Sequence, residues 1–354
     1  MLSRRAVCGG LLCALMARRV RSEVALDALG EQISNGVFPN VHAVVALQNG
    51  QQIFERYRAG EDEVWGQSLG VVDHMPDTLH DIRSVTKSIT SLLLGIALRD
   101  NFEEAIAQPI QSFLPQTQKI NPDMSDITLH HVLTMTAGLD WNEMEVPYTS
   151  PDNDEIRLSS TVDPVGLVMA RNSRTRPGEA WYYNGGLTQI VAAVIEHLTD
   201  RPFLTFADEA LFAPMGIEQY LWMRPHAWPE DHAPSAASGL RMTARDLSRI
   251  GQLVLDRGMW QGRAIVPAGW IEISTTRHVA DTPWGPPGMY GYGYFWFPGQ
   301  LPTGHSVIRA VGNGDQRLFV VPEIGLSLAV LAGNYNDFRH AVGERILAAA
   351  IDEI

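Results

Sequence analysis

Lysine is nearly absent from this chain, although positive charge is not. Of 27 basic residues, 25 are arginine, and only Lys87 and Lys119 are lysine. Arginine stays protonated in proteins, whereas a buried lysine can lose its proton. A lysine that serves as a general base can therefore stand only at one of these two positions.

Cysteine and long apolar runs are scarce as well. Cys8 and Cys13 are the only cysteines, so the chain after residue 22 has no thiol for a disulfide, a nucleophile or a metal site. No apolar run in the body reaches the roughly 18 to 20 residues needed to span a membrane. With the five arginines of 1–22 set aside, 22 basic residues face 40 acidic ones, a formal charge of −18. This acidity, without a basic stripe, argues against binding to nucleic acid or to an anionic membrane surface.

Residues 1–22 have the composition of a bacterial export signal. Arg4 and Arg5 precede an apolar run over 6–17, which is typical of a twin-arginine signal peptide. Because Arg18 and Arg19 follow the apolar run directly, a retained N-terminal helix is the alternative. We expect a periplasmic or secreted protein.

The length of 354 residues and the 45% apolar content indicate a globular protein with one large domain or two closely packed ones. Asn49-Gly50 joins two apolar runs and predicts a β-hairpin. A second hairpin is predicted through 322–325. Runs typical of strands occupy 41–47, 51–57, 290–297, 317–321 and 326–331.

Helical periodicity dominates the middle of the chain, where long loops separate the helices. Thr128 is a predicted helix N-cap. The loops over 140–154 and 225–238 are long enough to predict lids or walls of a binding site. Helical patterns occupy 23–35, 84–99, 128–135, 186–198, 203–211 and 338–354.

Strands at both ends with helices between them predict an α/β (α+β) fold, an antiparallel sheet flanked by helices with an inserted helical domain. The sheet domain is expected to combine 23–80 with 240–354, and the helical domain to occupy 81–239.

Ser84 and Lys87 stand at the head of the predicted helix over 84–99. Residues three apart share a helix face, so the lysine amine can reach the serine hydroxyl. The helix N-terminus favours the negative charge that develops during acyl transfer. Burial is expected to lower the pKa of Lys87 and leave a neutral amine. An N-cap serine followed by a solvated lysine is the structural alternative.

Tyr182 and Asn184 lie just before the predicted helix over 186–198. A tyrosine can relay a proton between serine, lysine and leaving group, and an asparagine can orient a substrate amide. Two core aromatic residues at a helix start are the alternative.

Ser84-x-x-Lys87 followed by Tyr182-x-Asn184 resembles the serine β-lactamase-related hydrolases. These include class C β-lactamases, DD-peptidases, carboxylesterases and 6-aminohexanoate-dimer hydrolases. The resemblance extends to 133–142, 243–247 and 320–323, and these stretches favour the 6-aminohexanoate-dimer-hydrolase-like branch. It implies a β-lactamase/DD-peptidase-like fold and an acyl-serine intermediate at Ser84, with Lys87 as base and Tyr182 as proton relay.

The third motif of this family, Lys-Thr-Gly or His-x-Gly, has its best match at residues 312–316, without a leading cation. The resemblance implies that Asn313, Gly314 and Asp315 line the substrate site and that a backbone N–H, such as that of Asp315, completes the oxyanion hole. Trp141 and Tyr148, in the loop over 140–154, either wall the cleft or are structural aromatic residues.

Three functions therefore compete. The favoured one is an esterase or amidase that acts on a small ester or amide, without metal or cofactor. The second is a β-lactamase or DD-peptidase that acts on penicillins or peptidoglycan peptides, and the missing cation argues against it. The third is a catalytically silent binding protein with the same fold, and the intact Ser84, Lys87 and Tyr182 argue against that. The sequence does not indicate an oligomeric state.

Overall fold

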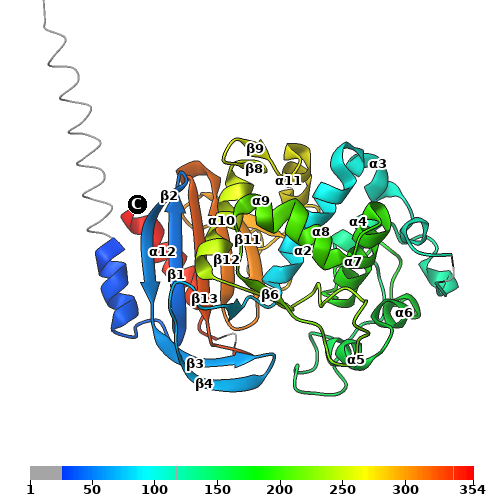
Figure 1. Cartoon of the computed structure of the whole chain (residues 1–354), viewed down its shortest axis with the longest axis horizontal. Helices are drawn as coiled ribbons and strands as arrows, with labels where there is room; N and C mark the ends of the chain where they lie inside the picture. Colours follow the sequence, from blue (N-terminus) through cyan, green and yellow to red (C-terminus); the bar gives the residue numbers. More distant parts are fainter. Residues whose placement is uncertain (1–25, 117, 338) are drawn as a thin grey trace, which may run out of the picture.

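The computed structural model of the chain describes residues 26–354 apart from 117 and 338. Its centre is a six-stranded antiparallel sheet in the spatial order β10-β11-β12-β13-β1-β2 (Figure 1). The first strand of the chain thus pairs with β13, a strand from its last sixty residues, and β2 forms the edge of the sheet. The strands of this sheet are β1 (Val41–Gln48), β2 (Gln51–Tyr57), β10 (Phe297–Gln300), β11 (Ser306–Gly312), β12 (Gln316–Val321) and β13 (Leu326–Ala332).

Both predicted hairpins are confirmed. Asn49 (φ 50°) and Gly50 (φ 77°) connect β1 to β2 in the left-handed region that this dipeptide tolerates. A short 3₁₀ turn over Pro322–Ile324, closed by Gly325 (φ 62°), connects β12 to β13. The local turn chemistry therefore sets the register of both strand pairs.

Alternate side chains of β1 enter two separate cores. Ala43 and Val45 belong to the larger hydrophobic cluster, whereas Val44 and Ala46 belong to the smaller one. This two-residue period places the two clusters on opposite faces of the sheet. Both faces of the sheet are therefore covered, which explains the nearly continuous apolar sequence of β1.

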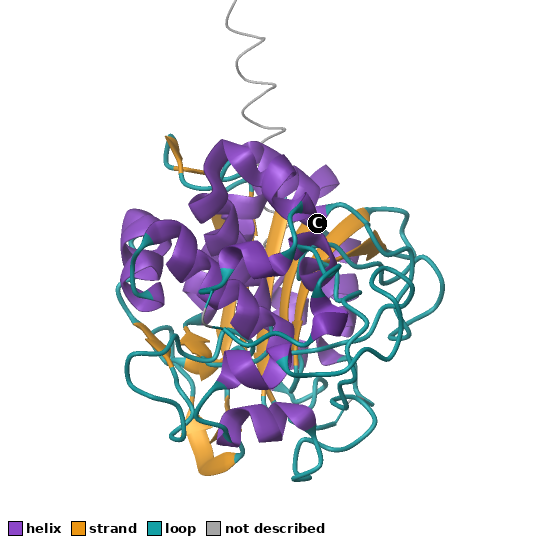
Figure 2. Ribbon diagram, turned by 90° about the vertical axis from the view of Figure 1, so that its right-hand side faces the viewer, coloured by secondary structure: helices purple, strands orange, loops and turns teal. Residues whose placement is uncertain are grey.

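Helices cover both faces (Figures 1 and 2). The helix over 26–34 and α12 (Val342–Glu353) pack on the smaller cluster, and α10 (Ala244–Leu255) packs on β1, β12 and β13 from the other side. The remaining α-helices are α2 (Val85–Leu98), α3 (Phe102–Ala107), α4 (Leu129–Leu133), α5 (Asp154–Ser160), α6 (Pro164–Met169), α7 (Gly186–Thr199), α8 (Phe203–Ala207), α9 (Ala213–Met215) and α11 (Ala268–Thr275).

Helix α2 runs through the interior and connects the sheet to the helical layer. It contacts β11 and β12 on one side and α7 and α11 on the other, and 12 of its 14 residues are buried. A helix that is buried nearly all round occupies the interior of a protein, and the buried polar residues of α2 therefore need partners inside the fold. The large cluster continues from the sheet through α2 into the helices, and the predicted division at residues 81 and 239 stays a prediction.

Four predicted elements differ from those observed, and one of them is the helix expected over 338–354, which begins at Val342. The aromatic run 290–297 was expected to be a strand, but regular pairing begins only at Phe297. Phe295 has a φ of 64°, and Tyr292 forms an isolated bridge with Val279, so this run is a buried irregular segment. The helix expected over 128–135 ends at Leu133, and the one over 203–211 changes at Asp208 into a π-helix over Asp208–Phe212.

Smaller sheets lie beside the main one. Their strands are β3 (Ala59–Val64) with β4 (Gln67–Asp73), β5 (His80–Asp81) with β7 (Leu240–Met242) and β6 (Tyr220–Trp222), and β8 (Met259–Trp260) with β9 (Arg263–Ala264). Short 3₁₀ turns occupy Arg99–Asn101, Ile110–Phe113 and Pro122–Met124.

The predicted export signal and both cysteines lie outside the described residues. Within the described part of the chain, none of the helices combines the length and the apolar character needed to cross a bilayer.

Candidate active site

Ser84 lies at the junction between β5 and α2. It is the N-cap residue of α2, yet its side chain makes no capping hydrogen bond, so the hydroxyl is free for other contacts. The preceding residue, Arg83, has a φ of 49°. Its guanidinium bonds Glu63 at 2.6 Å, lies 3.3 Å from Asp81 and covers the ring of Tyr335. These contacts hold the strained turn that presents Ser84.

Lys87 is 2% exposed and points back toward Ser84. Its Nζ donates to Ser84 Oγ at 3.0 Å and to the carbonyl oxygen of Ala237 at 2.9 Å. A solvated lysine behind a capping serine is therefore not what the structure contains. The spacing of three residues on one helix places the amine and the hydroxyl in contact, as predicted.

Tyr183, not Tyr182, is the tyrosine beside this pair. Tyr183 is 3% exposed, and Lys87 Nζ lies 4.9 Å from the centre of its ring. The Tyr182 hydroxyl instead donates at 3.0 Å to the exposed Glu145, and Arg174 covers its ring. Neighbouring residues of an extended segment point in opposite directions, so only one of the two tyrosines can face Ser84. The placement predicted for Tyr182 was wrong by one residue.

Asn184 does not face the cavity either. Its side chain is buried, and its Oδ1 accepts from the backbone N–H of Leu187 at 3.3 Å in the first turn of α7. Counted from Tyr183, the third position of the Tyr-x-Asn pattern is Gly185. The Glu155 carboxylate occupies the space that a side chain at position 185 would fill. A Cβ on Gly185 would therefore collide with Glu155 Oε2.

The buried Glu143 and the half-buried Glu155 form an acidic pair near Tyr183, which the sequence did not predict. Glu143 accepts from Trp141 Nε1 at 2.8 Å, from the Tyr148 hydroxyl at 2.9 Å and from Gly185 N at 2.6 Å. Burial and the neighbouring Glu143 raise the pKa of Glu155 to about 7, and Lys87 opposes this rise. Glu143 comes from the long loop over 140–154, and Glu155 comes from the first turn of α5, which follows this loop.

Tyr183 and the acidic pair together change the expected charge of Lys87. Burial lowers the pKa of Lys87, but the Tyr183 hydroxyl, Glu143 and Glu155 raise it by more. Its pKa thus lies above the ordinary value of lysine, contrary to the expected neutral amine. Burial also raises the pKa of Tyr183, against the lowering effect of Lys87. The resting site therefore contains an ammonium and a neutral phenol.

The turn after β11 brings part of the predicted third motif to Ser84. Asn313 lines the cavity that contains Ser84, and Asp315 lines a second hollow on the other side of the serine. Gly314 instead forms an isolated bridge with Asn334. Gly312 must lack a side chain, because a Cβ there would collide with the carbonyl oxygen of Ile82. The β11 end therefore packs directly against the segment that carries the nucleophile.

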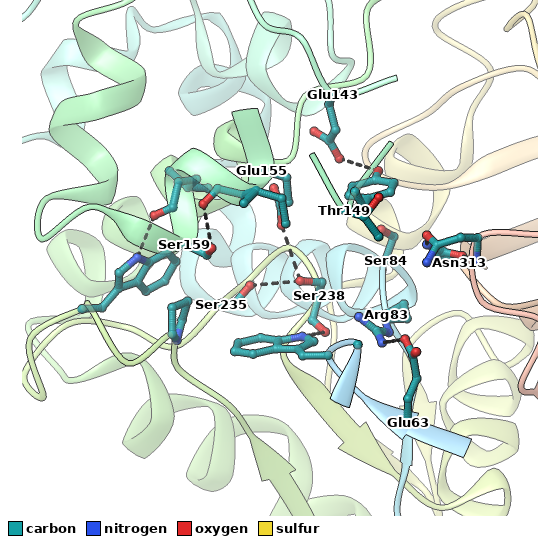
Figure 3. Close-up of a pocket in the computed structure, with 18 residues that line it drawn as sticks. Glu63, Arg83, Ser84, Glu143, Thr149, Glu155, Ser159, Ser235, Ser238 and Asn313 are labelled. Carbon is teal, nitrogen blue, oxygen red and sulfur yellow. Dashed lines mark hydrogen bonds and ion pairs between the residues drawn. The ribbon is translucent and has the colours of Figure 1, made fainter. Parts of the chain in front are cut away.

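The cavity beside Ser84 lies between the two long loops, where walls were predicted. Figure 3 shows Ser84 between Asn313 on one side and Glu155 with Ser238 on the other. Tyr148 lines both hollows. Trp141 does not, since it is fully buried and its indole N–H is used by Glu143. Besides Ser84, Tyr148 and Asn313, the cavity is lined by residues of the two long loops, of α5, of the β3–β4 hairpin and of the turns that follow β5 and β13: Glu63, Trp65, Gly66, Arg83, Glu143, Thr149, Glu155, Ile156, Leu158, Ser159, Pro225, Trp228, Ser235, Ser238 and Asn336.

Comparison with known proteins identifies the family of this chain. The beta-lactamase family model matches residues 30–351, and the chain belongs to this family. The α/β fold with its antiparallel sheet is thus the β-lactamase/penicillin-binding-protein-like fold, as predicted.

Two curated relatives have hydrolase names. The chain is 25% identical over 238 residues to a 6-aminohexanoate-dimer hydrolase of Paenarthrobacter ureafaciens, a match over 65% of this chain and 56% of the relative. It is 28% identical over 185 residues to esterase EstB of Burkholderia gladioli, over 49% of this chain and 45% of that protein. The chain spans about half the length of the curated relatives it matches.

The fold itself extends further than these sequence matches. A beta-lactamase/D-alanine carboxypeptidase of Yersinia pestis, solved with citrate, superposes with a TM-score of 0.70. That match covers 94% of this chain and 98% of the other, at 16% identity. Together with the curated relatives, the family supports a hydrolase.

Proposed function

We propose that the chain is a serine hydrolase that cleaves a small ester or linear amide through an acyl-Ser84 intermediate. The observation that carries this proposal is the 3.0 Å contact between the Lys87 amine and the Ser84 hydroxyl. The lysine is buried, and the serine side chain makes no hydrogen bond that caps the helix. An activated hydroxyl needs a base within this reach.

In the first step the Ser84 hydroxyl oxygen attacks the substrate carbonyl carbon and forms an ester bond. Its proton passes to Lys87 in the unprotonated form of the amine. The C–O or C–N bond of the substrate breaks, and the leaving group takes a proton through the Tyr183 hydroxyl. Water then attacks the acyl-serine, so that the acid is released and Ser84 regains its proton.

The oxyanion is proposed to bind at the start of α2. The backbone N–H of Ser84 lies at the N-terminus of this 14-residue helix, where negative charge is stabilised. A backbone N–H of the 313–315 turn is the second donor that we propose, because this turn lines the hollows around Ser84.

The charges around the cavity favour a substrate without an anionic group. Glu63, Glu143 and Glu155 line it, and Glu63 already pairs with Arg83. A substrate carboxylate would approach these acids without a free cation from the 312–316 turn. We therefore favour neutral or amine-bearing esters and amides over penicillins and cell-wall peptides.

Intact-protein mass spectrometry after treatment with a fluorophosphonate tests the nucleophile. We expect one adduct per chain, lost in Ser84→Ala. A folded wild-type protein without an adduct would contradict the proposal and favour a silent binding protein. Turnover of p-nitrophenyl esters and linear amides, with nitrocefin alongside, then tests the substrate class, and preferential nitrocefin hydrolysis would favour the β-lactamase alternative.

A further inference from the structure

Four buried side chains converge behind β5, on the far side of the Arg83 turn from Ser84. We propose that His42, Asp62, His74 and His80 bind one divalent transition-metal ion of the zinc class. Each offers one ligand atom, and these atoms all lie within 4.8 Å of one another. The four residues come from β1, β3, the end of β4 and β5, so the fold and not a sequence motif assembles them.

The spacing of the ligand atoms suits tetrahedral coordination. His42 Nδ1 lies 2.9 Å from His80 Nε2, His74 Nε2 lies 3.9 Å from Asp62 Oδ2, and one ligand atom from each of the four residues lies within 4.8 Å of the others. Ligands at about 2.0 to 2.1 Å from zinc in a tetrahedron are about 3.3 Å apart. Small side-chain adjustments therefore suffice to enclose an ion.

Two atoms of the cluster lack any hydrogen-bond partner. His74 Nε2 and Asp62 Oδ2 are both fully buried, and neither makes a hydrogen bond. Their residues are 2% and 4% exposed. Buried polar atoms without a partner are costly and rare. A metal ion between them would satisfy both at once.

The hydrogen bonds around the cluster leave two histidine lone pairs facing each other. His80 Nδ1 lies 2.9 Å from the carbonyl oxygen of Asp81, so this nitrogen must carry the proton. His42 Nε2 lies 3.1 Å from Asn40 Oδ1, and Asn40 Nδ2 donates to the Glu61 carbonyl, which fixes the amide orientation.

In neutral rings, the remaining nitrogens, His42 Nδ1 and His80 Nε2, then have no proton between them at 2.9 Å. A bound cation would neutralise these facing lone pairs, and the outer contacts are of the kind that orient zinc-bound histidines. Asp62 is oriented in the same way. Its Oδ1 accepts from Glu63 N at 2.8 Å and from the Tyr335 hydroxyl at 3.0 Å, which leaves Oδ2 for the ion.

Three imidazoles and one carboxylate favour zinc over magnesium or calcium. Four protein ligands leave no open position for a substrate, which is typical of a structural site. The ion would fix β5, whose Asp81 also pairs with Arg241 and Arg83, directly ahead of Ser84. We therefore expect metal binding to stabilise the fold around the nucleophile without taking part in the chemistry.

Elemental analysis of the full chain, purified from zinc-supplemented medium and gel-filtered, tests the proposal. We expect about one equivalent of zinc per chain. The equivalent should be lost in His74→Ala and Asp62→Asn and retained in His278→Ala, a matched control from a half-buried histidine outside the cluster. Reconstitution with Co²⁺ should give the visible bands of tetrahedral cobalt, and a chelator should lower the Tm of wild type.

Folded wild type that holds less than roughly a tenth of an equivalent after zinc reconstitution, with no cobalt spectrum, would overturn the proposal. The cluster would then be a hydrogen-bonded network that shares a proton. Because metal content is measured on wild type, an unfolded variant does not decide the result. Fluorophosphonate labelling is scored separately, so failure of this site is distinguishable from failure of the proposed hydrolase.

Discussion

Glu155 fills the space beside Gly185 that a side chain at that position would otherwise occupy. A Cβ on Gly185 would collide with Glu155 Oε2, and Glu143 Oε2 lies 3.2 Å from the same point. Position 185 therefore requires a glycine because a side chain would collide with the acidic pair. The backbone conformation does not require one, since a φ of −62° suits any residue. The acidic pair and the glycine form one unit at the back of the candidate active site.

Gly185→Ala should destabilise the protein, because the added methyl group displaces the Glu155 carboxylate. Overpacking of this kind costs about 1 to 3 kcal/mol. Glu155→Ala should open the space for the new methyl group. The double variant should therefore lose less stability than the sum of the losses in the two single variants. Urea unfolding of the four proteins measures this coupling. Additive losses would show that the two residues do not share the space.

Glu155 also predicts how stability depends on pH. Its pKa is raised to about 7 in the folded protein from an ordinary value of 4.5, so the folded state binds the proton more tightly than the unfolded state. Stability from this group is present below pH 4.5 and is lost as the pH rises to about 7.

Glu155→Gln removes that proton equilibrium and should flatten the fall in stability between pH 5 and pH 8. The midpoint of urea unfolding at each pH measures it. Glu104→Gln, at an exposed position, is the matched control and should keep the wild-type slope. An unchanged slope in Glu155→Gln would show that this carboxyl does not titrate in that range.

The sequence was most informative where local rules act. Turn chemistry at Asn49-Gly50 and helix spacing at Ser84 and Lys87 were sufficient for the β1–β2 hairpin and for the serine–lysine contact. The choice between Tyr182 and Tyr183 depends on which way an extended segment faces, and tertiary packing decides that. The Tyr-x-Asn motif alone therefore does not identify which of the two tyrosines faces Ser84.

Features assembled from distant residues could not be predicted. Tyr183, Glu143 and Glu155 come near Lys87 only in the folded chain, and together they reverse the expected pKa direction of the lysine. The cluster of His42, Asp62, His74 and His80 has no recognisable spacing along the chain, so the sequence suggested no metal. Its ligands become neighbours only where three separate sheets, which contain β1, the β3–β4 pair and β5, come together in the folded chain.

Lys87→Arg should abolish turnover of the substrate that the ester and amide screen identifies. Arginine cannot give up its proton, and loss of a general base costs on the order of 10²- to 10⁴-fold in rate. Because the pKa of Lys87 is raised, wild-type kcat should still be climbing above pH 7. Circular dichroism and Lys87→Met, which keeps a long side chain without charge, separate lost chemistry from lost structure. Near-wild-type kcat in Lys87→Arg would refute the base assignment.

The two adjacent tyrosines provide a matched pair of variants. Tyr183→Phe removes a buried hydroxyl beside Lys87 and should lower kcat about a hundredfold or more, as expected for a lost proton relay. Tyr182→Phe removes a hydroxyl that donates to the exposed Glu145 and should leave kcat within a factor of about two.

Steady-state kinetics of both variants on one activated ester measures the difference. A loss confined to KM in Tyr183→Phe would make this hydroxyl a binding group. A large loss of kcat in Tyr182→Phe, with Tyr183→Phe near wild type, would restore the assignment predicted from the sequence. It would also require the segment 181–184 to turn over when substrate binds, because the two rings now point to opposite sides of it.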